Sequence, residues 1–444
     1  MRLRLIAASL AAALSAPASG MGLLEAWNAA LDADPGYRAA RYELEAGRQA
    51  LPIARSTLRP SVNITTSDTK VRGTREFGNV APGSPAEQNL DYMSRQRALN
   101  VRMPLLNMDG RARVRQGEAQ VQYSEALFDA RGKDLANRLG KAYFDLLFAL
   151  DSVELAQGQV DAYRGQVAFA QRRLQAGEGT RTEVAEAEAR LDLAQVNLIE
   201  TRDQVDVVRR ALQNIVGRDT IGVVPPTRQV EPRPLEPATL EAWLAMAEDR
   251  SPEVRARRFS VEAARHEVAR NRAGHYPRID AVAAASRLQN DSVNTLNSDI
   301  NQRSFGLQVT VPIYQGGYVD ATTEQAIANL RRTESDLDAE LNTQRVEVRR
   351  QFLAAQNGMT KLDSYAKAVR SSEVALEATR RGFQAGLRTS LDVLDAQRQL
   401  FQSRRDQAQA RYQYLLAVLQ LRVSAGMPPE EAVSTLNAML TAAR

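Results

Sequence analysis

Two short glycine turns, Gln175-Ala-Gly-Glu-Gly179 and Gln384-Ala-Gly-Leu-Arg388, each interrupt a very long stretch of sequence without proline. Residues 105–224 and 313–427 contain none, and both stretches are rich in Ala, Leu, Gln, Glu and Arg. Proline inside a helix costs about 3 kcal/mol, so its exclusion over such lengths predicts helices far longer than the globular norm. Two long helical hairpins, each with a glycine at its turn, therefore decide the fold.

The two hairpins belong to an internal repeat. Pro35 and Pro252 begin similar segments and are separated by 217 positions, and Pro60 and Pro277 have the same separation. Beyond them the separation of equivalent positions becomes smaller, which places a longer loop in the first half. Self-similarity on this scale indicates duplication of one structural unit.

Each half also contains a predicted pair of strands. Residues 61–66 and 98–103 alternate between apolar and polar and flank a loop, 73–88, that is rich in Gly, Pro and Asn. The second half repeats this unit with 279–288 and 304–311. A half-buried sheet in a soluble domain is the alternative, but no other segment offers an apolar layer to cover the strands. Four strands cannot close a barrel, which needs about eight, so we expect several chains to close a transmembrane barrel together.

The chain begins with a segment typical of exported proteins. Residues 1–4 are basic, 5–14 are apolar but too short to span a bilayer, and 16–20 supply small residues for cleavage. No later segment has an uncharged apolar run of transmembrane length. The chain has no cysteine, so neither a disulfide nor a lipidated cysteine is expected. The net charge of +5 is small for 444 residues and does not suggest a nucleic-acid partner.

The predicted organisation is linear. A long helix over 319–381 would extend roughly 95 Å at 1.5 Å per residue, far more than a compact domain needs. The predicted segments are a signal peptide (1–20), a first structural repeat (21–216), a proline-rich linker (217–238), a second structural repeat (239–426) and a C-terminal segment (427–444).

A search for catalytic and cofactor motifs is negative. His266 and His275 are the only histidines, and they lack the i, i+4 spacing of a helical metal pair. No Walker A motif, nucleotide-binding glycine motif or serine elbow occurs. The sequence therefore predicts a protein that is not an enzyme and has no cofactor, and any energy for transport has to come from a partner.

Three segments of the second half resemble the TolC family of outer-membrane efflux and secretion ducts. They are Gly274-His-Tyr-Pro-Arg278, Val309-Thr-Val-Pro-Ile-Tyr-Gln-Gly-Gly317 and Gly386-Leu-Arg-Thr-Ser-Leu-Asp-Val-Leu-Asp-Ala396, and the last two are specific in combination and order. The resemblance implies a mainly α fold with a transmembrane β part. In the family, a homotrimer forms a twelve-stranded outer-membrane barrel, four strands per chain, that continues into a periplasmic helical tunnel.

The resemblance also implies function and partners. Family members carry drugs or unfolded proteins outward and dock to a periplasmic adaptor and an inner-membrane transporter of the RND, ABC or MFS type. The barrel contacts outer-membrane lipid. The runner-up interpretation is a periplasmic coiled-coil adaptor or structural protein, which leaves the paired strands and the duplication unexplained. A general diffusion porin is disfavoured because long helices add nothing to such a pore.

Asp392 and Asp395 match the family's paired aspartates that line the tunnel constriction. Spaced i, i+3, they share one helix face just past the Gly386 turn. Without the resemblance, a solvated helix face or helix start is the simpler interpretation. Three chains would place six carboxylates in a narrow pore, where they could bind cations and where crowding would raise some of their pKa values.

Arg388 matches the family's arginine that ties the second hairpin to the first hairpin of a neighbouring chain. Thr182 and Glu183 match its partners, with glutamate in place of aspartate, so a charge-assisted bond is still expected. Phe383 stands where relatives often carry a hydrogen-bonding tyrosine, so we expect only packing from it. Arg181 is a candidate to compensate, although a solvated arginine is an equally good interpretation.

Both glycine turns resemble the family's adaptor-docking tips. The small residues at each turn are Ala176 and Gly177 in the first hairpin and Ala385 and Gly386 in the second. They would leave grooves that a partner hairpin can enter. A plain helix-terminating turn also favours glycine, and both roles are compatible.

Overall fold

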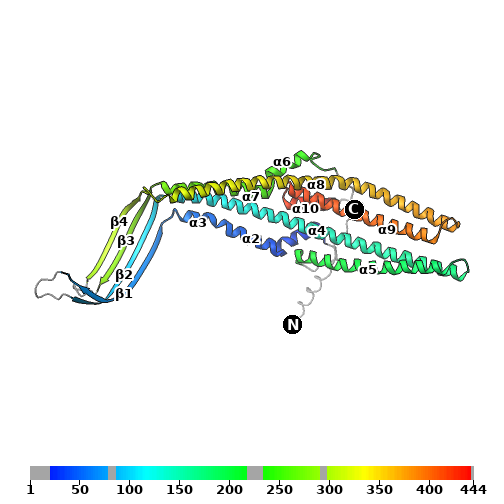
Figure 1. The fold of residues 1–444 in the computed structure, drawn as a ribbon, viewed down its shortest axis with the longest axis horizontal. Helices are drawn as coiled ribbons and strands as arrows, with labels where there is room; N and C mark the ends of the chain where they lie inside the picture. Colours follow the sequence, from blue (N-terminus) through cyan, green and yellow to red (C-terminus); the bar gives the residue numbers. More distant parts are fainter. Residues whose placement is uncertain (1–20, 79–86, 218–233, 291–297, 442–444) are drawn as a thin grey trace, which may run out of the picture. The chain divides into compact units, whose positions relative to one another are not determined.

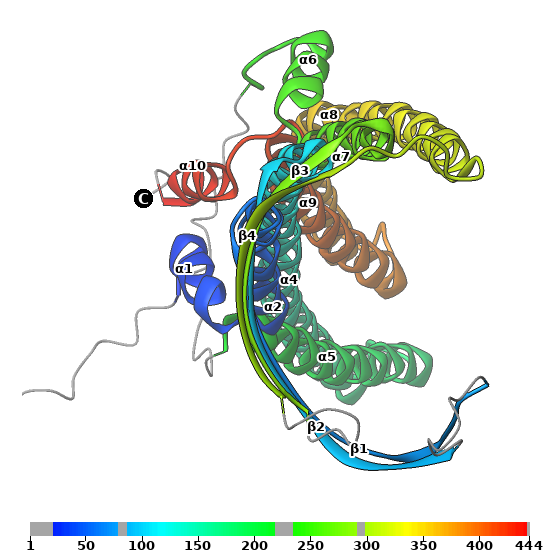
Figure 2. The ribbon, with the colours of Figure 1, turned by 90° about the vertical axis from the view of Figure 1, so that its left-hand side faces the viewer.

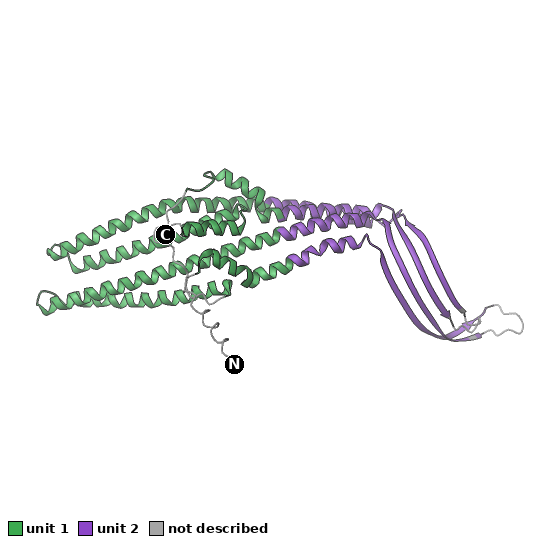
Figure 3. Cartoon of the chain, turned by 180° about the vertical axis from the view of Figure 1, so that it is seen from behind, with its two compact units in different colours: residues 1–43, 126–255, 339–444 green, residues 44–125, 256–338 purple. Residues whose placement is uncertain are grey.

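The structure is a computed structural model that describes residues 21–78, 87–217, 234–290 and 298–441. The predicted signal peptide, residues 218–233 of the predicted linker and the tip of each strand loop lie outside these ranges. The chain divides into two compact units, which Figure 3 distinguishes by colour. Each unit takes segments from both predicted repeats. Unit 1 comprises residues 1–43, 126–255 and 339–444, and unit 2 comprises residues 44–125 and 256–338.

The same series of elements occurs twice along the chain (Figure 1). The first series consists of α1 (Leu23–Ala33), α2 (Pro35–Arg48), α3 (Ala50–Ser56), β1 (Ser61–Glu76), β2 (Glu87–Leu106), α4 (Met108–Gln175) and α5 (Arg181–Val216). The second consists of α6 (Leu240–Arg250), α7 (Pro252–Arg272), η1 (Ala273–His275), β3 (Arg278–Asn290), β4 (Ser298–Thr310), α8 (Tyr318–Gln384) and α9 (Ser390–Ser424), followed by α10 (Pro429–Thr441). The two predicted long hairpins are therefore confirmed. Among the described helices, none combines the length and the apolar character needed to cross a membrane.

Proline sets the start of two helices at equivalent places. Pro35 is the first residue of α2 and Pro252 the first residue of α7, a position where the missing N–H costs nothing. Before Pro35, the Asp34 carboxylate accepts a hydrogen bond of 2.7 Å from the Tyr37 N–H and pairs with Arg138 of α4 at 2.9 Å. One helix therefore ends before Pro35 and the next begins there, and an ion pair between the buried Asp34 carboxylate and the more exposed Arg138 guanidinium fixes this break to α4.

The four strands of unit 2 form one antiparallel sheet in the order β1-β2-β3-β4. The sequence suggested two separate strand pairs, but β2 and β3 pair from Ser94 with Asn290 to Leu106 with Ile279 and join them. The predicted loop 73–88 was wrong at both ends, because β1 and β2 continue their pairing as far as Glu76 with Glu87. Backbone hydrogen bonds hold this part of the ladder, and they need no apolar alternation in the side chains.

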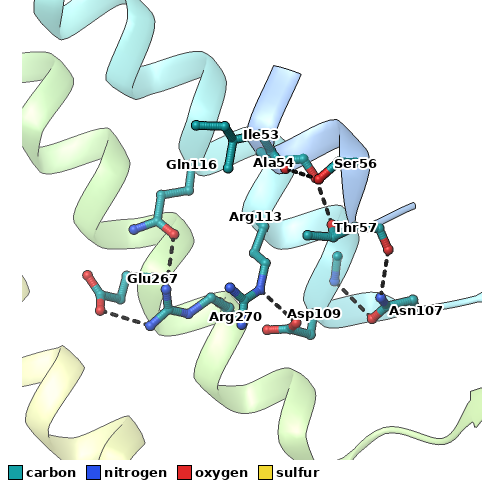
Figure 4. Close-up of polar contacts among 11 residues, drawn as sticks. Ile53, Ala54, Ser56, Thr57, Asn107, Asp109, Arg113, Gln116, Glu267 and Arg270 are labelled. Carbon is teal, nitrogen blue, oxygen red and sulfur yellow. Dashed lines mark hydrogen bonds and ion pairs between the residues drawn. The ribbon is translucent and has the colours of Figure 1, made fainter. Parts of the chain in front are cut away.

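The sheet continues into helices through a polar junction in unit 2, drawn in Figure 4. The Asn107 side chain accepts a hydrogen bond of 2.9 Å from the Gly110 N–H and so caps the start of α4. Its amide group also donates to the Thr57 carbonyl at 3.4 Å, just after α3. Further along, Arg270 of α7 donates to Gln116 of α4 at 3.5 Å (Figure 4).

Unit 1 has its hydrophobic core where the helices of the two hairpins pack closely. Tyr143, Phe144 and Trp243 are at most 3% exposed. Gly140 lies so close to α9 that a Cβ there would be 2.4 Å from a Leu419 methyl carbon. Small residues therefore allow these charged, alanine-rich helices to pack with few aromatic side chains.

Candidate gate at the hairpin turns

The turns of both hairpins belong to unit 1 and have the same backbone geometry. Gly177 and Gly386 adopt φ values of +77° and +71°, which favour glycine. In the first turn the Glu178 N–H donates to the Arg173 carbonyl at 2.9 Å, and in the second the Leu387 N–H donates to the Gly382 carbonyl at 2.8 Å. Both turns thus end a helix in a Schellman motif.

The helix that follows each turn begins with a capping box. In the first hairpin, the Thr180 hydroxyl accepts from the Glu183 N–H and the Glu183 carboxylate accepts from the Thr180 N–H, both at 3.2 Å. In the second, the Asp392 carboxylate accepts from the Thr389 N–H at 2.8 Å and from its hydroxyl at 3.0 Å. This role of Glu183 and Asp392 was not predicted, although the Thr-x-x-acid spacing is visible in the sequence.

The two predicted pore aspartates have different surroundings within one chain. Hydrogen bonds from Thr389, backbone first and then side chain, together with the charge of Arg388, hold the pKa of Asp392 below its usual value. This direction is opposite to the rise that crowding of six carboxylates would cause. Asp395 instead accepts a hydrogen bond of 3.3 Å from Arg190 of α5 and pairs at 3.3 Å with Arg398 of its own helix.

Phe383 lies between the hairpins and does more than fill space. Its ring meets that of Phe169 from α4 edge to face, with centroids 5.9 Å apart. The guanidinium carbon of Arg173 stands 5.3 Å from the centre of the Phe383 ring. The same guanidinium donates to the Glu178 carbonyl at 2.7 Å and lies 3.9 Å from the Glu183 carboxylate. Arg173 therefore connects the first turn to an aromatic ring of the second hairpin.

Sequence reasoning missed Phe169, Arg173 and Arg190. Each lies on the first hairpin and acts on a residue of the second, so no local spacing marks it. Gln166 adds a further link, because its amide donates to the Ser390 hydroxyl at 3.3 Å. Thr182 and Arg388 are exposed, as a contact with another chain would require.

One hollow beside the gate has three arginines in its lining. A space of about 280 Å³ lies between α4, α5 and α9, and its lining includes Arg190, Arg398 and Arg405 together with Tyr163 and Phe401. Within the described ranges, no group of three His, Cys, Asp or Glu side chains could hold a metal ion. The chemistry near the turns is therefore that of ion pairs and helix termini.

Comparisons with known proteins agree with this architecture. The chain matches the outer membrane efflux protein family over residues 26–218 and 243–427. The alkaline protease secretion protein AprF of Pseudomonas aeruginosa is 33% identical over 93% of this chain and 86% of AprF. The proteases secretion protein PrtF of Dickeya chrysanthemi is 33% identical over 96% of this chain and 92% of PrtF. Among solved structures, the outer membrane protein VceC of Vibrio cholerae has a TM-score of 0.75 at 19% identity, covering 91% of this chain and 96% of VceC.

The duplicated strand pairs, the long hairpins and these relatives define an outer-membrane channel for efflux or secretion. The chain belongs to the outer membrane efflux protein family, the TolC family that its sequence resembles. The predicted family, fold class and outer-membrane location are thereby confirmed. The relatives are transport channels and not enzymes, and channels of this kind work with a periplasmic adaptor and an inner-membrane pump.

Proposed function

We propose that three copies of this chain close a twelve-stranded barrel in the outer membrane. The two faces of the sheet support this assembly. One face carries apolar residues that pair with apolar residues of the neighbouring strand, among them Val62, Leu99, Phe305 and Leu307. The exposed fraction of these four residues is between 40% and 82% in the single chain. β1 and β4 form the edges of the described sheet. Open edges are not tolerated in lipid, so further chains have to pair with them.

The curvature of the sheet supports an assignment of one face to the interior of the proposed barrel. The sheet bends strongly in Figure 2. A hollow of about 470 Å³ lies on the polar side, over Asn63, Asn100, Arg102 and Ser304. A polar concave side and an apolar convex side are what a water-filled barrel in lipid requires.

The trimer has a direct test. Purified protein in detergent should have the mass of three chains by light scattering and cross-linking, and it should form channels in planar bilayers. A monomer with an intact β-sheet spectrum would reject the proposed barrel.

We further propose that the cargo is a protein, exported through a periplasmic adaptor and an energised inner-membrane transporter. The observation that carries this proposal is the 33% identity to two protease secretion proteins over nearly the whole chain. The test places this chain in a Pseudomonas aeruginosa strain that lacks AprF. Secreted protease activity should return, with AprF as positive control. Restored drug resistance in a strain lacking its own drug-efflux duct, without restored protease secretion, would assign small molecules instead.

At the gate, we propose that Asp392 and Asp395 lie at the narrowest part and that Arg388 binds Thr182 or Glu183 of a neighbouring chain. The intrachain contacts of Phe383 and Arg173 support a closed state in which the hairpins are held together. The adaptor would dock at the tips of both hairpins, on one surface formed by Ala176, Gly177, Ala385 and Gly386.

A further inference from the structure

Four arginines gather on the convex face of the sheet, beside the apolar residues proposed to face lipid. The antiparallel register places Arg97 of β2 directly opposite Arg287 of β3. Arg303 of β4 lies opposite Ala285, one row nearer the apolar residues, and Arg95 lies one row farther from them. Side chains two residues apart along a strand share a face, so all four arginines are on the same side as Leu99.

This arrangement concentrates positive charge. Like charges directly opposite each other on neighbouring strands are destabilising. Arg287 is partly compensated, because its Nε donates to Asp299 at 3.0 Å. Asp68 lies opposite Arg95. Arg97 and Arg303 are exposed, and neither has an ion-pair partner in the part of the chain that the structure describes. The cluster thus retains positive charge that nothing in the described sheet neutralises.

The position of the cluster selects the partner. Arg97 lies six residues from Met103, about 20 Å along β2, and Met103 is at the end of the strand nearer to α4. The apolar band of outer-membrane barrels is about 25 Å tall. Because barrel strands are tilted by about 35–45°, that length corresponds to roughly 15 Å of height, so the change in residue type and not the length marks the boundary. The row that contains Arg97 and Arg287 also contains Thr66 and Asn301 and has no apolar member, whereas the adjoining rows toward the helices contain Leu99 and Phe305. The arginines therefore lie where the apolar face ends, on the side of the strand loops and away from the helices.

We propose that Arg97, Arg287 and Arg303 bind the phosphate groups of lipopolysaccharide in the outer leaflet. This inference rests on the proposed barrel, which makes the convex face the lipid face and the loop side the exterior. Arginine binds phosphate oxygens with paired, charge-assisted hydrogen bonds, and the adjacent Leu99 and Phe305 would contact the acyl chains. An anion between Arg97 and Arg287 would also relieve their mutual repulsion.

The test is native mass spectrometry of the purified trimer titrated with lipid A. Dephosphorylated lipid A and phosphatidylglycerol are titrated in parallel. Lipid A should bind with at least about ten-fold higher affinity than either of these, and Arg97→Gln with Arg303→Gln should remove about ten-fold of that affinity. Arg102→Gln is the matched control, because Arg102 is an arginine of the same sheet on the concave face.

The outcomes separate this inference from the proposed barrel. If the protein is a conducting trimer but binds all three lipids with equal affinity, the arginine site is rejected and the barrel is retained. The same conclusion follows if Arg102→Gln lowers the affinity for lipid A as much as the double variant does. Failure to form any trimer would reject the barrel itself. Heat-resistant trimer bands on gels should be the same for all variants, so that a change in lipid A affinity reports on the arginine site and not on assembly.

Discussion

Phe383 makes more specific contacts in the structure than its sequence position predicts. Its lack of a hydroxyl predicts the loss of a hydrogen bond, and packing alone was expected in its place. The structure shows an edge-to-face contact with Phe169 and a guanidinium from Arg173 over the ring. Each such contact is worth about 0.5 to 1.5 kcal/mol, which is comparable to an ordinary hydrogen bond.

We predict that Arg173 and Phe383 are energetically coupled in the closed state. Arg173→Gln and Phe383→Leu should each raise the fraction of open channels in planar bilayers. The double variant should add less than the sum of both, with a coupling of about 1 kcal/mol. Arg172→Gln is the control, because within the described ranges the Arg172 side chain donates only to the Ala168 carbonyl of its own helix. Strict additivity would show that the ring and the guanidinium do not act together.

The second residue-scale prediction concerns cation block at Asp392 and Asp395. Asp392→Asn combined with Asp395→Asn should weaken block by divalent cations added at the periplasmic side. Arg190→Gln should strengthen it by about two- to five-fold, because Asp395 loses one of two neutralising arginines and a half-exposed pair contributes up to about 1 kcal/mol. Arg202→Gln, which changes an α5 arginine bonded to Gln157, should have no effect. If the double aspartate variant is blocked as strongly as the unsubstituted protein, neither aspartate lines the pore.

At the scale of elements, Asp34 fixes the start of α2 to α4. Burial alone would raise its pKa, but hydrogen bonds from Arg138 and the Tyr37 N–H outweigh burial and hold the pKa below its usual 3.8. A carboxyl whose pKa is depressed by folding stabilises the folded state above its unfolded pKa. That contribution disappears as the pH falls through the lower, folded value.

We therefore predict that Asp34→Asn lowers the free energy of unfolding by about 1.5 to 3 kcal/mol at neutral pH. The difference from the unsubstituted protein should shrink as the pH falls below 3.8 and vanish below the depressed pKa of folded Asp34. Asp134→Asn is the matched control, because Asp134 pairs with the same Arg138 but is 58% exposed, and it should cost under about 1 kcal/mol. Chemical unfolding followed by circular dichroism over a pH series measures both. A loss that is the same at every pH would show that the charge of Asp34 is not the cause.

The elements differ in how far sequence alone predicts them. The long helices were predictable because proline exclusion and the glycine turns at Gly177 and Gly386 are local signals. The outer halves of β1 and β2 were not, since Lys70, Arg72 and Asp91 interrupt apolar alternation and only pairing with the neighbouring strand defines them. The gate divides in the same way. Its motif residues on α9 were visible, whereas partners such as Arg173 depend on which helices pack together.

At the scale of the whole molecule, the duplication does not produce one compact unit per repeat. The strand pairs of both repeats join through β2 and β3 in unit 2, and the hairpin turns of both lie in unit 1. Each repeat therefore contributes half of the proposed membrane part and half of the proposed gate. In an assembly of several copies, contacts between the two hairpins of one chain would alternate with contacts between hairpins of neighbouring chains.

The last prediction compares these two kinds of contact. If Arg388 binds Thr182 or Glu183 of the neighbouring chain, Arg388→Ser should open the channel more than Phe383→Ala. A charge-assisted bond contributes roughly 1.5 to 3 kcal/mol. The two contacts of the Phe383 ring lie near the lower end of about 0.5 to 1.5 kcal/mol each, because the ring is only half-buried, and symmetry repeats every contact three times. Conductance in planar bilayers at neutral pH measures the difference. If Arg388→Ser leaves conductance unchanged while Phe383→Ala raises it, the contacts within each chain hold the gate, and the interchain latch of the family has no counterpart at Arg388.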